Sequence, residues 1–432
     1  MCIIDKTSKG EYMEKYFKMK GYDLYLIPTD KFKNITISLK LQNHLDKETV
    51  SKRTLLSFML TGGTKDYPST QALSKYLENL YGMKFSTSVS TKGKSHLINV
   101  NSVCINEEYL PYQEDLLTQQ IQLLNDIFHR PNADNHMFDE NMFKIKKKEL
   151  KDRIISNQDD KFYYSLEKLF EYFGKNQALG ISTYGYLSDI DQITNEELYE
   201  YFLSCLKNDK KYIYVVGNID DSIVSLFDKY VSFPENDCQF ETVYNLKNQR
   251  AYVNEIIEKQ DVTQAKLNMG YEVDANYVLE NHYAFALFNT IFGGISQSKL
   301  FKVVREENSL CYYISSSYDA FHGVMVITAG IESSDYQKVK ELIQEQLKLM
   351  QNGCFSDEDI EIAKLALKNS FMKTKDEPIS QISFLFNRNV TNIKETDEQY
   401  LQKMMTVTKE EIVQVCQHIK LDTIFLLKGR DE

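Results

Sequence analysis

Hydrophobic and polar residues alternate in two well-separated stretches of the chain, residues 34–41 ("NITISLKL") and residues 263–271 ("TQAKLNMGY"). The apolar positions in the two stretches are Ile35, Ile37, Leu39, Leu41, Ala265, Leu267, Met269 and Tyr271. A period of two is typical of a β-strand that turns one face toward a core. Each stretch therefore predicts a strand that opens one half of the protein and buries one face.

The elements that follow these strands occur in the same order in both halves. Residues 73–102 and 300–330 each contain an amphipathic helical segment, an aromatic and Ser-rich strand, a polar turn and a second alternating strand. Longer helices come next, with apolar residues at helical spacing. Their apolar positions are Leu117, Ile121, Leu124, Phe128, Val339, Ile343, Leu347 and Met350. Breaks at Pro131 and Gly353 precede a second, charged helix in each half.

This repeated order predicts a duplicated α+β fold, in which each half is a mostly antiparallel sheet with helices packed on one face. Residues 212–220, "YIYVVGNID", read as the buried strand that ends the first half. The polar stretch after it contains a proline and reads as a connector. We therefore expect an N-terminal half at 1–228, a linker at 229–250 and a C-terminal half at 251–432.

Composition narrows the class of function. The formal charge of −11 argues against nucleic-acid binding, which usually needs a basic surface. No apolar run reaches 18 residues and the N-terminus lacks a signal-peptide pattern, so we expect no membrane association. The seven cysteines include no C-x-x-C pair and are typical of free thiols in a reducing compartment, which predicts a cytoplasmic location.

Three motifs in this order resemble the pitrilysin/insulinase family of zinc metallopeptidases. They are "GGTKDYPST" at 62–70, "VVGNID" at 215–220 and "FGGISQSKLFKVVREENSLCYY" at 292–313. The resemblance covers nearly the whole chain. It points to the branch of half-length subunits that work in pairs, as in mitochondrial processing peptidase.

The resemblance also locates the positions of a metal site. Active members carry H-x-x-E-H before the G-T-x-x-Y-P turn, where two imidazoles one helical turn apart bind Zn²⁺ and the Glu activates water. Here those positions hold Thr54, Ser57 and Phe58. The third-ligand position falls on Lys146, with Glu149 the nearest acid. We therefore expect no metal and no cofactor in this chain, and zinc in a partner subunit.

The second half retains two residues that the family uses opposite the zinc. Arg305 and Tyr312 have the spacing of an Arg and a Tyr that bind substrate and stabilise the oxyanion. The alternative is structural: Arg305 in an ion pair with a neighbouring glutamate, and Tyr312 in the core. Cys311 alternates with Tyr312 and should face the other side of the strand. Gly293 and Gly294 let a helix pack closely on a strand, or guide substrate.

These features predict a non-zinc-binding subunit of a heterodimeric peptidase, inactive alone, whose zinc-bearing, pitrilysin-like partner hydrolyses peptides. Arg305 and Tyr312 would then act on the peptide in the complex. A catalytically inactive peptide-binding or scaffold protein, possibly a homodimer, is the alternative. A third possibility is an independent hydrolase with a new metal site, which zinc analysis of the purified protein would test.

Overall fold

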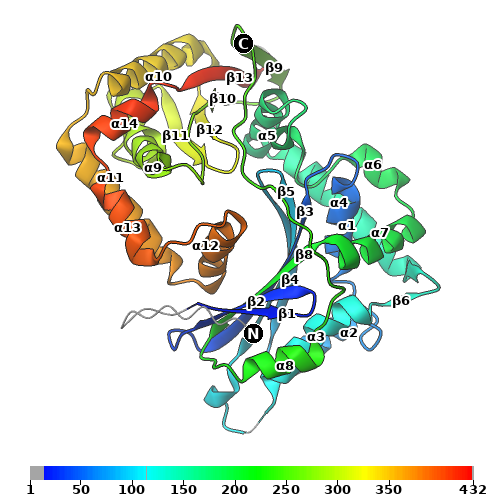
Figure 1. The fold of residues 1–432 in the computed structure, drawn as a ribbon. Coiled ribbons are helices and arrows are strands. Elements are labelled where there is room, and N and C mark those ends of the chain that lie inside the picture. Colours follow the sequence, from blue (N-terminus) through cyan, green and yellow to red (C-terminus); the bar gives the residue numbers. More distant parts are fainter. Residues whose placement is uncertain (1–13, 113, 431–432) are drawn as a thin grey trace.

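The computed structural model describes residues 14–112 and 114–430 and contains two large β-sheets, one in each half of the chain (Figure 1). The strands of the first sheet are β1 (Lys15–Met19), β2 (Tyr22–Pro28), β3 (Asn34–His44), β4 (Lys84–Lys92), β5 (Ser95–Ile105) and β8 (Lys210–Gly217). The strands of the second are β9 (Asn254–Gln260), β10 (Ala265–Glu272), β11 (Cys311–Asp319), β12 (Val324–Ile331) and β13 (Lys420–Gly429). A separate short hairpin consists of β6 (Ala133–Asp134) and β7 (Met137–Phe138).

The two sheets share one topology. The order β4-β5-β3-β8-β2 in the first sheet corresponds to β11-β12-β10-β13-β9 in the second. In each sheet only the last of these pairs is parallel, β8 with β2 and β13 with β9. Strand β1 extends the first sheet by one antiparallel strand. The predicted fold class, α+β with two homologous halves of mostly antiparallel sheet, is therefore confirmed.

Helices cover the outer side of each sheet (Figure 1). The helices of the first half are α1 (Val50–Met59), α2 (Thr70–Asn79), α3 (Leu116–His129), α4 (Glu140–Asp159), α5 (Lys161–Phe173), α6 (Leu187–Gln192), α7 (Asn195–Asn208) and α8 (Ile223–Tyr230). Those of the second half are α9 (His282–Asn289), α10 (Tyr336–Gln351), α11 (Asp357–Thr374), α12 (Pro378–Val390), α13 (Asp397–Thr406) and α14 (Lys409–Cys416), with π-helical turns η3 (Thr290–Gly294) and η4 (Phe301–Glu307).

The predicted helix boundaries follow local chemistry. Helix α3 ends at His129, just before Pro131, and α10 ends before Gly353, whose φ of +71° suits glycine. Helix α11 begins after Ser356, whose side chain and that of Asp359 form a capping box. The acidic residues of its first turn lie at the positive end of the helix dipole.

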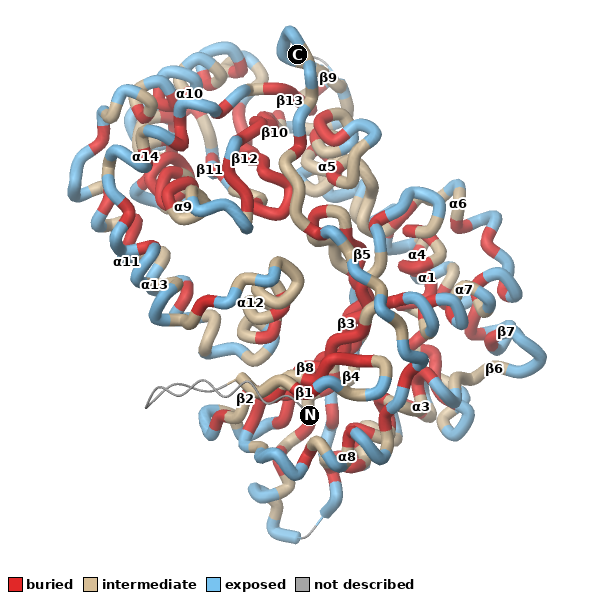
Figure 2. The backbone as a smooth tube through the Cα atoms, in the orientation of Figure 1, coloured by how far each residue is buried: buried red, intermediate tan, exposed pale blue. Residues whose placement is uncertain are grey.

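Alternation along β3 places its apolar residues against the helices of the first half, as predicted. The opposite face is also buried, and its residues are polar: Thr36, Ser38, Lys40 and Gln42. Lys40 donates to Asn99 Oδ1 at 2.8 Å, and Gln42 donates to Ser95 Oγ at 2.8 Å. Figure 2 shows β3 buried along most of its length. A period of two thus marked the core face without showing that the other face is covered as well.

The inner face of each sheet, opposite its own helices, is covered by a helix from the other half. Helix α12 of the second half packs on the first sheet, where Phe386 meets the rings of Tyr212 and Tyr214. Helix α5 of the first half packs on the second sheet, where Leu169 meets Phe425. The two halves are therefore joined by reciprocal helix packing as well as by the chain (Figure 1).

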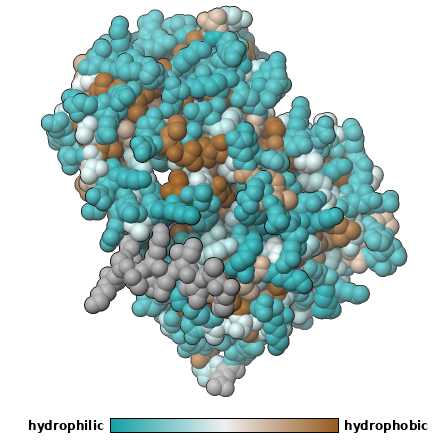
Figure 3. All heavy atoms as spheres, viewed as in Figure 1, coloured by the Kyte–Doolittle hydropathy of each residue, from teal (hydrophilic) through white to brown (hydrophobic). Residues whose placement is uncertain are grey.

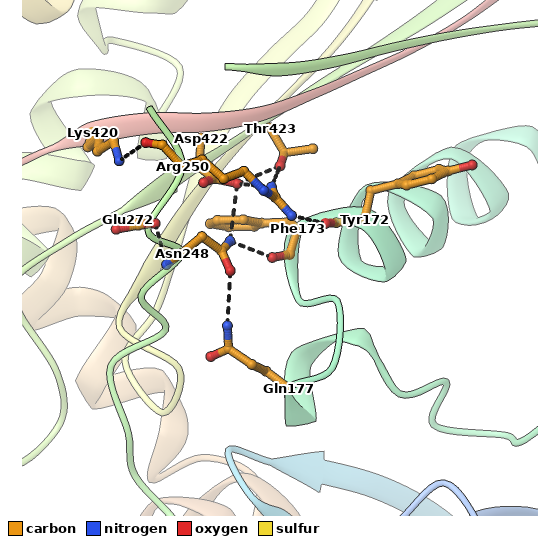
Figure 4. A network of polar contacts seen from close by, with 9 residues as sticks. All are labelled: Tyr172, Phe173, Gln177, Asn248, Arg250, Glu272, Lys420, Asp422 and Thr423. Atoms are coloured by element: carbon orange, nitrogen blue, oxygen red, sulfur yellow. Dashed lines mark hydrogen bonds and ion pairs between the residues drawn. The ribbon is translucent and has the colours of Figure 1, made fainter. Parts of the chain in front are cut away.

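The connecting segment is bonded to both halves. Lys94 N–H donates to Thr242 O at 2.9 Å in the first half, and Leu246 N–H donates to His322 O at 2.7 Å in the second. Arg250 then bonds the Tyr172 carbonyl at 2.9 Å, within the polar network drawn in Figure 4. This network joins the end of α5 to strands β10 and β13, so the segment fixes the junction between the halves.

Among the described residues, no helix combines the length and apolarity needed to cross a bilayer. The face shown in Figure 3 is largely hydrophilic, and its apolar side chains gather where the two halves approach each other.

Candidate functional site

Helix α1 is held against the first sheet by a buried charge pair. The Arg53 guanidinium lies 2.6 Å from Asp209 Oδ2 and donates to Leu41 O at 2.7 Å. The turn after α1 starts with Gly62, where a Cβ would lie 2.6 Å from Met142 of α4. Gly63 follows with φ +122°, a backbone conformation that favours glycine. The paired glycines therefore set α1 and α4 close together.

The three predicted positions on α1 make structural contacts. Thr54 is buried and donates to Thr183 O at 3.2 Å. Ser57 is buried, and its carbonyl accepts a 2.6 Å hydrogen bond from Thr87 of β4. Phe58 is half-buried and packs against the core of the first half. Helix α1 therefore anchors the edge strand β4.

Lys146 lies on α4, which packs on α1. Lys146 is 5% exposed, and its Nζ lies 2.9 Å from Glu149 Oε2. The position that the resemblance predicts for the third ligand thus holds a buried lysine, and Glu149, the nearest acid, is paired with it. The carboxylate that could have bound a metal instead compensates this charge.

These residues do not fit a zinc site. Zinc is bound in proteins by thiolate, imidazole and carboxylate ligands. Thr54, Ser57 and Phe58 supply none of these, and Lys146 adds a positive charge. Within residues 14–112 and 114–430, no cluster of three His, Cys, Asp or Glu side chains has the arrangement of a metal site.

The sequence did not point to His96, a neutral histidine beside this site. His96 of β5 is fully buried, and its Nε2 lies 3.1 Å from the same Thr183 carbonyl that Thr54 contacts. Because a carbonyl only accepts, Nε2 carries the proton. Burial and, to a smaller extent, the nearby Arg53 charge lower the pKa of His96 to about 3. The only signal in the sequence was the position of His96 on an alternating strand.

Arg305 and Tyr312 lie in the other half, on η4 and β11. Arg305 is exposed, its guanidinium lies 4.6 Å from the Phe301 ring centroid, and no carboxylate of the described residues lies within 4 Å of it. Tyr312 is 63% exposed, and its hydroxyl lies 3.4 Å from Glu332 Oε1. The structure thus gives neither residue the ion pair or core position of the structural alternative. It also leaves them in a different half from α1.

Packing explains the state of the Cys311 thiol and the need for glycine at position 293. Burial raises the pKa of the Cys311 thiol to about 11, so the thiol stays protonated at neutral pH. A Cβ on Gly293 would lie 2.8 Å from the backbone nitrogen of Ser316. Gly293 therefore allows η3 to pack directly on β11, as the first of its two interpretations predicted.

Strands β4 and β11 are the corresponding edges of the two sheets. Among the described strands β4 pairs only with β5, and most of its residues are half-buried or exposed. An open edge offers main-chain donors and acceptors to another extended chain. The edge beside the altered metal positions is therefore able to accept a peptide.

Comparisons with known proteins place these features in context. Residues 192–367 match the family described as "Peptidase M16 inactive domain". The chain is 35% identical to the "Probable inactive metalloprotease YmfF" of Bacillus subtilis, over 96% of this chain and 97% of that protein. It is 23% identical to the "Uncharacterized zinc protease YmxG" of the same organism, over 75% of this chain and 79% of that protein.

A solved structure has nearly the same fold. A conserved protein from Enterococcus faecalis V583 superposes with a TM-score of 0.90 at 30% identity. The match covers 97% of this chain and 99% of that one. The similarity thus includes both halves and their relative placement.

Proposed function

Since this chain belongs to the peptidase M16 family, the pitrilysin/insulinase family of metallopeptidases, we propose that it is the zinc-free subunit of a two-chain peptidase. Its partner would be a zinc-bearing M16 subunit with an intact H-x-x-E-H helix. The main support is the buried Lys146 ammonium at the third-ligand position. Because the described residues form no cluster that could hold a metal, zinc chemistry in this proposal comes from the partner subunit.

In this proposal Arg305 and Tyr312 act on a peptide bound to the partner. A guanidinium can donate several hydrogen bonds to a peptide carbonyl or carboxylate. A phenol can donate to the carbonyl oxygen that becomes negative during hydrolysis. Their exposure on η4 and β11 supports this role, because both side chains can be reached from outside the chain.

The substrates would be extended peptides. An unfolded segment can add to a free sheet edge through main-chain hydrogen bonds, with little dependence on its sequence. Edge strand β4, fixed to α1 through Thr87, offers such an edge. We also infer a cytoplasmic location, supported by the free thiols of the buried Cys104, Cys205 and Cys416.

The test combines this chain with a zinc-bearing M16 subunit from the same organism and measures cleavage of fluorogenic peptides. We expect activity in the mixture and none with this chain alone. Tyr312→Phe should lower kcat by roughly 10²-fold, as does loss of one oxyanion donor. Arg305→Ala should lower kcat/KM by a comparable factor, mainly through a higher KM.

Two exposed residues provide matched controls. Tyr252 is 80% exposed in the connecting segment, and Arg430 is exposed after β13. Tyr252→Phe and Arg430→Ala should leave turnover unchanged. If Tyr312→Phe and Arg305→Ala also leave turnover unchanged in an active mixture, their proposed roles are wrong. If no zinc-bearing subunit forms an active complex with this chain, the paired peptidase itself is contradicted.

A peptide-binding protein without proteolytic function is the second candidate. It is favoured by the printed name of the B. subtilis relative, a probable inactive metalloprotease that matches almost the full chain. In that case the isolated chain, as a monomer or homodimer, would bind peptides at β4 without any partner. Peptide binding that persists while every candidate partner fails to form a complex would support this function.

A further inference from the structure

The two sheets differ at one edge. In the first sheet, β1 pairs in antiparallel fashion with β2 and covers its outer side. Strand β9 is the counterpart of β2, because each pairs in parallel with the last strand of its half. Among the described strands, β9 pairs only with β13. The second sheet therefore lacks the strand that closes the corresponding edge of the first.

The segment that precedes β9 is held elsewhere and does not close this edge. Just before the strand, the Arg250 guanidinium bonds Asp422 and lies 2.7 Å from Thr423 Oγ1, both on β13. The chain thus enters β9 from the junction between the halves, whereas β2 is preceded by an antiparallel strand. An edge strand without a neighbour offers its outward N–H and C=O groups to another chain.

Exposed apolar side chains lie along this edge. Tyr252 is 80% exposed, Ile257 is 51% exposed and Val253 is 37% exposed. Ile257 is the middle residue of β9, which lies at the rim of the molecule (Figure 1). Apolar side chains in a row on an unpaired strand are typical of a surface that contacts a partner.

The charges of β9 are complementary to those of a second copy of the same strand. Glu255 and Lys259 are exposed on either side of Ile257, and alternation places all three side chains on one face of the sheet. In an antiparallel pair centred on Ile257, a two-fold axis brings Glu255 of each copy opposite Lys259 of the other. Opposite charges directly across such a pair stabilise it.

These two side chains are available on this face. Lys340 of α10 lies 2.6 Å from Glu255 Oε2 and keeps that carboxylate on the helix-covered side of the strand. Among the described residues, no carboxylate lies within 4 Å of Lys259 Nζ. The Lys259 charge therefore has no counterion that it would lose on pairing with a second copy.

We propose that β9 is a self-association edge, at which two copies of this chain pair in antiparallel fashion. The two five-stranded second sheets then form one continuous sheet, with Ile257 of each copy at the two-fold axis. Tyr312 lies on β11, at the opposite edge of the same sheet. The inference is therefore independent of the proposed function, because it uses neither the Arg305–Tyr312 surface nor β4.

Sedimentation velocity of the full chain, over a hundredfold range of protein concentration, tests the association. Pairing of the seven residues of β9 buries less surface than the roughly 1,200 Å² of a standard interface, so we expect a dimer with a dissociation constant in the micromolar range. Ile257→Lys places two ammonium groups at the two-fold axis and should weaken association at least about tenfold.

A charge exchange tests the register. Lys259→Glu alone and Glu255→Lys alone each bring like charges face to face at both positions, so each variant should be monomeric. An equimolar mixture of the two variants restores opposite charges at both positions. It should form a mixed dimer at concentrations where neither variant associates, and only the register centred on Ile257 predicts this result.

Leu365→Lys is the matched control, since Leu365 is 57% exposed on α11 in the same half. It should associate as the wild type does. A wild-type chain that stays monomeric throughout the concentration range would overturn the proposal, as would undiminished association of Ile257→Lys. Failure of the two charge variants to form a mixed dimer would also contradict it. These outcomes leave the paired peptidase standing, because that proposal is tested by cleavage with the zinc-bearing subunit.

Discussion

At the scale of single residues, three of the predicted metal positions, Thr54, Ser57 and Lys146, are buried in the packed interior. The Thr183 carbonyl accepts from both Thr54 and His96, so the residue at the first predicted ligand position holds a loop in place. His96 is neutral because it is buried, and its Nδ1 has no partner among the described residues. Such a histidine stabilises the fold only while it stays uncharged.

His96 makes folding stability depend on pH. Its pKa is about 3 in the folded protein and about 6.5 in an exposed histidine. Above pH 6.5 both states are neutral, whereas below it the unfolded chain binds a proton that the folded chain does not. We therefore expect the free energy of unfolding to fall by about 1.4 kcal/mol per pH unit from this group between pH 6 and pH 4.

Urea unfolding at several pH values measures this slope. His96→Gln should show a shallower decline than the wild type, while His418→Gln, at an exposed position, should match it. An unchanged slope in His96→Gln would show that His96 is protonated in the folded state.

At the scale of elements, α1 packs against α4, and the family resemblance assigns predicted metal positions to both helices. Positions 54 and 58 are four residues apart and therefore lie on one face of α1. Helix α4 packs against α1 and contributes position 146. Both helices have structural roles, because α1 holds β4 through Thr87 and both helices bury the core of the first half.

If this reading of the two helices is correct, three substitutions should create a zinc site. We expect Thr54→His, Phe58→His and Lys146→Glu together to bind one zinc ion per chain, because they supply two imidazoles and a carboxylate. Elemental analysis after dialysis gives the stoichiometry. The double variant with Lys146 retained is the control and should bind far less zinc. Equal zinc in both variants would show that position 146 does not face the α1 pair.

At the scale of the whole molecule, the halves are interlocked. Phe386 from α12 is 1% exposed among Tyr212 and Tyr214 of the first sheet. In the second sheet, Gly270 has no side chain that would block Phe173 of α5, which lies 2.6 Å from the position of a Cβ. Each half therefore completes the core of the other, and the two should unfold together.

Phe386→Ala tests this coupling. Removal of a buried phenylalanine typically costs 3–5 kcal/mol, through lost burial and a remaining cavity, so we expect about that loss in the free energy of unfolding. We also expect the single transition in urea to separate into two, which hydrogen exchange would assign to the two halves. Leu365→Ala, at a position 57% exposed on α11, is the control and should cost less than about 1 kcal/mol. A single transition with a small loss would contradict the interlocking.

Local patterns in the sequence were enough to predict the duplicated α+β architecture. The alternation at Ile35–Leu41 follows from the pleat of a β-strand, and the helix break at Gly353 follows from its backbone conformation. Both are local properties, so the neighbouring residues are enough to predict them. The metal positions are different, because they were assigned through the family resemblance and stay a prediction. What the sequence does give directly is that Thr54, Phe58 and Lys146 are not zinc-ligand residue types.

Only the tertiary structure revealed the contacts between residues far apart in sequence. It paired Lys146 with Glu149, brought α5 and α12 across to the opposite sheets, and placed His322 and Glu167 around one cavity. Periodicity reports which face of a strand is buried, not which element buries it. That choice depends on how the two halves dock, and the energy of docking is spread over contacts that no single segment of the chain contains.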